Sequence, residues 1–149
     1  KMRLPVSKSY MPSVQTTRYA ILRGVQDMVR TGKKDEAIKL LDTYFKAFPD
    51  MNFHYDSDII PFLQAYAEAG AYDKAKAPMK ILVDNTAEKL RFYYSISSDD
   101  LERGFSSDYS YCLRTIDELK DLATKAKDTA EVAELDKVFK AYMTKPTPK

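Results

Sequence analysis

Apolar residues recur every three or four positions along most of the chain, which is the spacing of one face of an α-helix. Stretches in which apolar and polar residues alternate, as in a half-buried strand, are rare, and the chain has only 4 glycines. The pattern therefore predicts an all-α protein of five or six helices.

Breaks in the apolar pattern predict where the first helices begin and end. A lead-in rich in proline and serine, from Leu4 to Pro12, precedes the first helix. That helix should stop near Thr31 and Gly32, because glycine readily adopts the left-handed conformation that closes many helices. A second helix should end before Pro49, since proline has no amide hydrogen to donate. These two helices would form a hairpin over residues 18–48.

Similar breaks divide the rest of the chain. Asp56 or Asp58 should cap a third helix that ends at Gly70. Pro78 should kink or delay a fourth helix, which stops at the polar stretch 95–100. A second hairpin would then cover 56–96, and C-terminal helices 106–143, with Asp128 and Glu131 placed as a capping box between them. We expect one helical domain over residues 1–149.

Two segments match each other at an offset of 38 residues, Thr31 to Ala37 and Ala69 to Ala75. Glycine, aspartate and alanine coincide in register, which suits a helix end, a helix start and a close helix crossing. The match resembles a tetratricopeptide (TPR) hairpin, although the usual Trp and Leu-Gly positions of the first helix are missing. The resemblance implies TPR-like antiparallel hairpins stacked as a short right-handed solenoid.

The run from Tyr10 through Tyr94, with its Leu90-Arg91-Phe92-Tyr93-Tyr94-Ser95-Ile96 end, also resembles a known region. It is similar to the soluble C-terminal region of a bacterial family of polytopic membrane proteins, a domain of unknown function. The membrane part of that family is similar to GT-C-type protein O-mannosyltransferases. The resemblance implies a glycosyltransferase-associated domain, tethered to a membrane on its periplasmic side, with the catalytic acidic residues outside this chain.

The composition of the chain argues against some classes of binding partner. Lys and Arg number 24 against 22 Asp and Glu, and these charges are spread along the chain instead of forming basic clusters, so nucleic acid is a poor partner. No stretch approaches the roughly 20 apolar residues of a membrane-spanning helix, and we expect no direct membrane insertion of this fragment. The chain begins at Lys1, which suggests a piece of something longer.

Few residues suggest chemistry. Asp56-Ser57-Asp58 could hold a divalent metal against a nucleotide sugar, but helix capping explains it better. His54 is the only histidine and has no recognisable partner. Cys112 falls on an apolar stripe, which favours a buried and inert thiol. We therefore expect no catalytic residue, no metal and no cofactor.

Two candidate binding surfaces remain. In stacked hairpins the first helices of successive pairs line a concave groove that can bind a peptide. The same mixed polarity of residues is also compatible with a solvated face that binds no ligand. The residues expected in the groove are Tyr19, Gln26, Arg30, Gln64 and Glu68. The second candidate is an aromatic platform at Phe92, Tyr93 and Tyr94. Helical geometry should turn at least one of these rings away from the core. The alternative is that the rings pack against the last helices.

These observations favour a non-enzymatic scaffold or protein-interaction domain. Its partner would be a protein or peptide, either the membrane part of the same protein or an acceptor polypeptide. One competing hypothesis is a metal-dependent sugar- or nucleotide-sugar-binding domain that uses Asp56 and Asp58. Another is a self-associating module that forms a homodimer through exposed aromatic residues.

Overall fold

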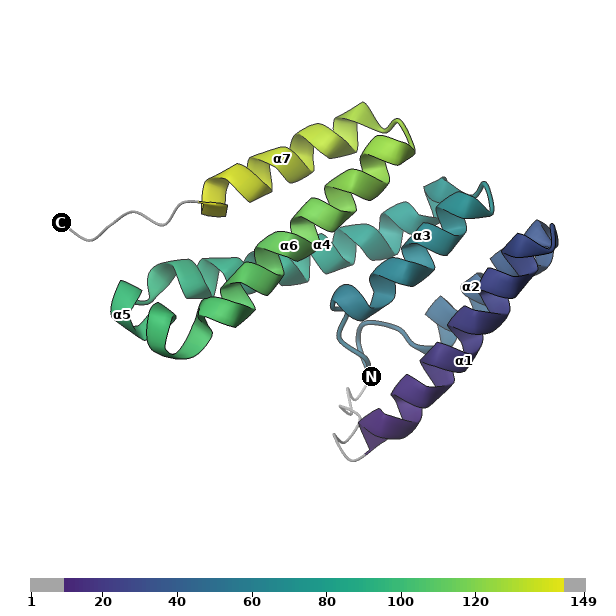
Figure 1. Ribbon diagram of the computed structural model, residues 1–149, viewed down its shortest axis with the longest axis horizontal. Helices are drawn as coiled ribbons and strands as arrows, with labels where there is room; N and C mark the ends of the chain where they lie inside the picture. Colours follow the sequence, from purple (N-terminus) through teal and green to yellow (C-terminus); the bar gives the residue numbers. More distant parts are fainter. Residues whose placement is uncertain (1–9, 144–149) are drawn as a thin grey trace. The chain divides into compact units, whose positions relative to one another are not determined.

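A computed structural model of the chain describes residues 10–143 (Figure 1). These residues contain six α-helices longer than a single turn and no strand, which confirms the all-α prediction. The chain divides into two compact units, Lys1–Ile81 and Leu82–Lys149. The single domain over residues 1–149 and the TPR-like solenoid both stay predictions.

The N-terminal unit begins with a helical hairpin. Helix α1 (Met11–Arg30) packs along α2 (Lys34–Ala47), and the two run antiparallel (Figure 1). A loop leads to the short 3₁₀ helix η2 (Ser57–Ile59) and to α3 (Ile60–Glu68), which contacts both α1 and α2. The unit ends within the first turns of α4 (Tyr72–Ser95).

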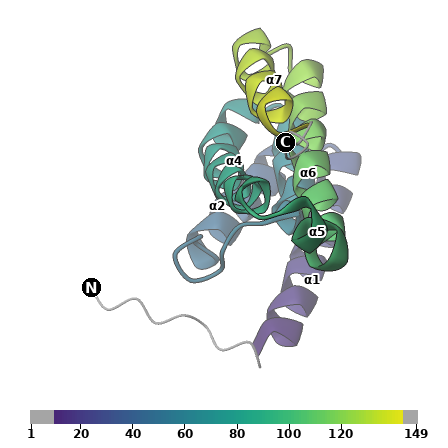
Figure 2. The same ribbon diagram turned by 90° about the vertical axis from the view of Figure 1, so that its left-hand side faces the viewer.

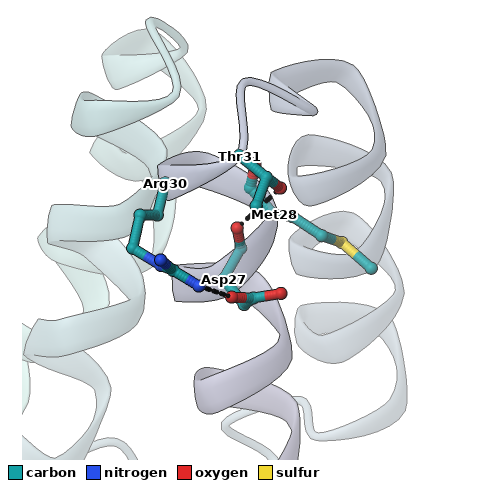
Figure 3. A network of polar contacts seen from close by, with 4 residues as sticks. All are labelled: Asp27, Met28, Arg30 and Thr31. Atoms are coloured by element: carbon teal, nitrogen blue, oxygen red, sulfur yellow. Dashed lines mark hydrogen bonds and ion pairs between the residues drawn. The ribbon is translucent and has the colours of Figure 1, made fainter.

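Glycine closes α1 as the sequence predicts. Gly32 has φ +80°, and the amide of Lys33 donates a hydrogen bond to the carbonyl of Met28 at 2.8 Å, which together make a Schellman turn. Figure 3 shows this helix end, where the Thr31 hydroxyl donates to the Asp27 carbonyl at 2.8 Å. Gly70, with φ +87°, closes α3 through the same arrangement. Both predicted glycine stops are confirmed.

Pro12 lies inside a helix, contrary to prediction, and the structure excludes one of the two alternatives predicted for Pro78. Helix α1 starts at Met11, so Pro12 belongs to its first turn instead of the lead-in. Proline is tolerated there because the first amides of a helix have no intrahelical acceptor. Helix α4 starts at Tyr72 and continues past Pro78, so this proline does not delay its beginning. The turn opened by Gly70 has already set the start of α4.

The core of the N-terminal unit contains packed aromatic rings beside its aliphatic side chains. The rings of Tyr44 and Phe62 stack with centroids 3.9 Å apart, and those of Phe45 and Tyr66 with centroids 5.8 Å apart. Ala37 and Ala75, which the sequence places at close helix crossings, are fully buried. Asp42 accepts hydrogen bonds from the Tyr66 hydroxyl at 2.8 Å and from Lys74 at 2.6 Å, so it links α2 to α3 and α4.

The C-terminal unit contains the rest of α4 and a second antiparallel hairpin. Ser97 caps the one-turn helix α5 (Ser98–Asp100), which continues as the π-helical segment η3 (Leu101–Phe105) into α6 (Ser106–Lys125). Helix α7 (Thr129–Met143) returns along α6 (Figure 2). The capping box predicted before α7 is present in part, because Asp128 accepts a hydrogen bond from the Glu131 amide at 3.2 Å.

Aliphatic residues form the core of the C-terminal unit. The fully buried side chains include Leu90, Ile116, Leu119, Ala123 and Leu135. The hydroxyls of two buried threonines donate to carbonyls one turn earlier, Thr86 to Leu82 at 2.7 Å and Thr115 to Tyr111 at 2.9 Å. Within residues 10–143, no helix is both long enough and apolar enough to cross a membrane.

Candidate functional site

A pocket of about 150 Å³ opens in the N-terminal unit, between α1 and the start of α3. A water molecule occupies about 30 Å³ of liquid, so this space would hold a group of roughly five heavy atoms. Its walls mix charged, amide and apolar groups. The lining residues are Gln15, Arg18, Tyr19 and Leu22 from α1 and Ser57, Asp58, Pro61 and Phe62 from η2 and α3.

Arg18 is the unusual member of this pocket. Its side chain is only 6% exposed, yet its Nε and Nη2 atoms have no hydrogen-bond acceptor among the residues that the structure describes. Residues 1–9 and 144–149 contain no Asp or Glu. The guanidinium lies over the rings of Phe48 and Phe53, 5.8 and 6.0 Å from their centroids. Both rings attract the guanidinium cation, but neither carries an oxygen or nitrogen acceptor for its N–H groups.

Leaving these donors buried has an energetic cost. A buried donor without an acceptor destabilises the folded state by about 1–3 kcal/mol. Native proteins have few such groups, and they gather where function requires them. Arg18 lines the pocket, and two of its donors are buried without an acceptor among the described residues, so we take the pocket as the candidate binding site.

The sequence analysis missed Arg18, although the pattern contains a sign of it. Arg18 precedes Leu22 by four residues and Val25 by seven, so it occupies the apolar face of α1. A charged residue in such a position is either paired, extended to solvent or functional. Only the fold distinguishes these cases, because Phe48, Phe53 and Asp58 come from distant parts of the chain.

Of the two acidic residues near the pocket, Asp56 caps the 3₁₀ helix η2, whereas α3 itself begins after Ile59 without the predicted aspartate cap. Asp56 is the N-cap of η2 and accepts a hydrogen bond from the Asp58 amide at 3.0 Å. The Asp58 carboxylate lines the pocket and accepts a hydrogen bond from Gln15 at 3.3 Å. Partial burial and the nearby Asp56 carboxylate raise the pKa of the Asp58 carboxyl group, and Arg18 opposes this shift. Within residues 10–143, no three His, Cys, Asp or Glu side chains are grouped so as to hold a metal ion.

Tyr44 adds a second buried polar group close to Arg18. Its side chain is 1% exposed, and its hydroxyl has no hydrogen-bond partner among the described residues. Burial raises the pKa of Tyr44 to about 12, while the Arg18 charge opposes the rise. The Tyr44 ring stacks on Phe62, which is part of the pocket wall.

The predicted groove residues are all exposed, but they do not all meet. Tyr19, 64% exposed, is the one that lines the pocket. Gln26, Gln64 and Glu68 lie at the surface outside it. Arg30 is engaged locally, since its guanidinium forms an ion pair with Asp27 at 2.5 Å (Figure 3).

The predicted aromatic platform lies in the C-terminal unit. Phe92 is 53% exposed, so the prediction that one ring leaves the core is confirmed. Its ring centroid lies 5.4 Å from that of Tyr93 and 5.9 Å from that of Phe105, a residue that the sequence analysis did not select. Tyr94 instead packs against Tyr142 of α7, with centroids 5.6 Å apart.

Two further residues considered for chemistry have local roles. His54 is exposed, and its Nδ1 lies 3.6 Å from an Asp50 carboxylate oxygen. Cys112 is buried as predicted, and burial raises the pKa of its thiol, which lowers the fraction of reactive thiolate.

Comparison with known proteins gives no relative from which a function could be transferred. No protein-family model, curated protein or solved structure matches the chain. The pocket around Arg18 is therefore the observation on which a function must be argued.

Proposed function

We propose that this chain is a non-catalytic, TPR-like protein-interaction domain whose N-terminal unit binds a segment of a partner polypeptide. The pocket lined by Arg18 supports the proposal, because the pocket is large enough for one side chain and two buried donors of Arg18 lack an acceptor within residues 10–143. The exposed ring of Tyr19 beside it offers the kind of aromatic contact that is enriched in protein interfaces. The partner segment would lie on Tyr19 and place one residue in the pocket.

The resemblance to membrane-protein C-terminal regions extends this proposal. It suggests that the partner is either the membrane-embedded part of the same protein or an acceptor polypeptide on the periplasmic side. The surface charges of both signs are compatible with either partner.

Selection from a random peptide library displayed on phage would test the proposed function. Peptides that bind the chain should lose at least about tenfold in affinity when Tyr19 is changed to alanine, since interfacial aromatic anchors commonly contribute that much or more. Tyr111→Ala is the matched control, because Tyr111 is 50% exposed and belongs to the other unit. A library that yields no binder, or binders unaffected by Tyr19→Ala, would count against the proposal.

Self-association is a second candidate function, supported by the exposed Phe92 and Phe105 rings in contact. Large apolar side chains exposed together often mark an interface. Sedimentation over a range of protein concentrations would detect it. A mass that stays monomeric across the range would remove this candidate.

A further inference from the structure

The unbonded edge of Arg18 defines the shape of a ligand group. In a guanidinium, the Nε–H and the Nη2–H point in parallel from one edge of the planar group. That edge matches the two oxygens of a carboxylate, which can accept both hydrogens at once. Phe48 and Phe53 lie near the guanidinium but carry no oxygen or nitrogen acceptor for this edge.

Charge around the pocket favours a carboxylate over a phosphate. Arg18 is the cation of the pocket wall, and Asp58 adds a carboxylate to the same wall with Asp56 close by. A phosphate monoester carries about −1.5 to −2 charges at neutral pH. Two negative charges would be repelled by the aspartates more strongly than the single charge of a carboxylate.

The Asp58 side of the pocket suggests the second contact. Its carboxylate accepts a hydrogen bond from Gln15 and has capacity for more, because a carboxylate offers about four lone-pair sites. An amino-acid residue bound by its carboxylate also carries a backbone N–H within a few bonds. Such an N–H could donate to Asp58 while the carboxylate contacts Arg18, so one residue would use both polar walls.

We infer that the pocket recognises a carboxylate of the partner segment, held in a two-point hydrogen bond by Nε and Nη2 of Arg18, with an adjacent N–H donated to Asp58. The carboxylate comes from an aspartate or glutamate side chain or from a chain terminus. The role of a polypeptide in presenting it rests on the proposed function, whereas the carboxylate site itself does not.

Nuclear magnetic resonance of the full chain tests this inference without knowledge of the partner. The Arg18 Nε–H resonance would be followed during titration with two small probes. N-acetyl-aspartate N-methylamide carries only a side-chain carboxylate, and N-acetyl-alanine carries only a terminal one. At least one probe should shift the resonance in a saturable manner, and the tighter probe identifies the source of the carboxylate. N-acetyl-asparagine N-methylamide and inorganic phosphate serve as comparison ligands.

Variants separate the two-point contact from simple charge attraction. Arg18→Lys keeps the charge but loses the parallel donors, so the carboxylate affinity should fall at least about tenfold. Arg23→Lys is the matched control, since Arg23 lies on the same helix and is exposed. Carboxylate affinity that is unchanged in Arg18→Lys would overturn the inference. So would an Arg18 resonance that neither probe moves, or phosphate binding more tightly than both.

The two proposals fail in different ways. If the probes bind at Arg18 but no library peptide binds the chain, the carboxylate site stands and the protein-interaction function falls. If peptides bind through Tyr19 with an affinity that Arg18→Lys leaves unchanged, the function stands and the carboxylate inference falls.

Discussion

The two units treat their buried polar groups differently. The N-terminal unit buries the Arg18 guanidinium and the Tyr44 hydroxyl, which have atoms without partners among the described residues. In the C-terminal unit the buried threonines, Thr86 and Thr115, donate hydrogen bonds to helix carbonyls. One core thus tolerates unbonded donors beside a pocket, while the other satisfies its polar groups within its own helices.

This difference indicates that the buried polar groups of the N-terminal unit serve binding, whereas those of the C-terminal unit are compatible with stability alone. Unbonded donors lower stability, so their presence in the packed core of the N-terminal unit needs a reason outside folding. The aliphatic core of the C-terminal unit has no buried side-chain donor without an acceptor among the described residues. We therefore expect truncation in the C-terminal core to destabilise the chain, and removal of Arg18 to do the opposite.

The largest effect should come from Leu119→Ala in the C-terminal unit. Leu119 is fully buried, and a truncated core leucine costs about 2–5 kcal/mol through lost burial and the cavity left behind. Urea unfolding followed by the amide exchange of α6 and α7 would measure the loss. Asp121→Ala, at an exposed position of α6, should change stability by no more than about 0.5 kcal/mol. Equal effects of the two variants would mean that the unit has no tight core.

Arg18→Met should stabilise the free chain, whereas truncation in the C-terminal core should destabilise it. Methionine keeps much of the apolar stem and removes donors that cost about 1–3 kcal/mol when buried without partners. Thermal unfolding should show a higher midpoint, and carboxylate binding should be lost. Arg23→Met, at an exposed position of α1, provides the comparison. A destabilised Arg18→Met chain would contradict this expectation and show that the contacts of Arg18 with Phe48 and Phe53 outweigh the cost of its unbonded donors.

The helix-closing turns offer a smaller test. Lys127 ends α6 in the left-handed conformation with φ 61°, where Gly32 and Gly70 end α1 and α3. Lys127→Gly should raise the free energy of unfolding by about 1 kcal/mol, because a side chain is strained in that conformation. Gly32→Ala should lower it by a similar amount, through backbone strain alone, since an added Cβ at Gly32 would meet nothing within 4 Å. Chemical denaturation would measure both, and changes of the same sign would refute this explanation.

The smallest effect concerns Asp42 and depends on pH. Its hydrogen bond with Lys74 holds the pKa of the Asp42 carboxyl group below its usual value, partial burial opposes the shift, and the Tyr66 hydrogen bond supports it. The stabilisation is therefore present above the unfolded pKa near 3.8 and is lost as the pH falls through the lower folded pKa. Asp42→Asn should lower stability by at most about 1 kcal/mol at pH 7, because the site is exposed.

Thermal unfolding of Asp42→Asn at pH 7 and at pH 2 would measure this dependence. The variant should differ from the parent chain at pH 7 and converge with it in acid. Asp121→Asn, at an exposed position of α6, should show no comparable convergence. A difference that persists unchanged at pH 2 would assign the effect to packing instead of charge.

Helix ends that depend on local chemistry were predictable from the sequence, and the binding pocket was not. Gly32, Gly70 and Asp128 act through contacts within a few residues, so short-range patterns reveal them. Pro12 misled the prediction because its effect depends on where the helix starts. Arg18 was missed because its neighbours Phe48 and Phe53 are brought to it only by folding.

The aromatic content of the chain has an optical consequence. There are 11 tyrosines and no tryptophan, so the chain has no indole fluorescence of its own. Tyr19→Trp would place a single indole at the rim of the pocket, where its emission wavelength would respond to any group that displaces water from the ring. The protein would then carry its own reporter, and occupancy could be followed by emission on the millisecond scale of rapid mixing without a labelled ligand.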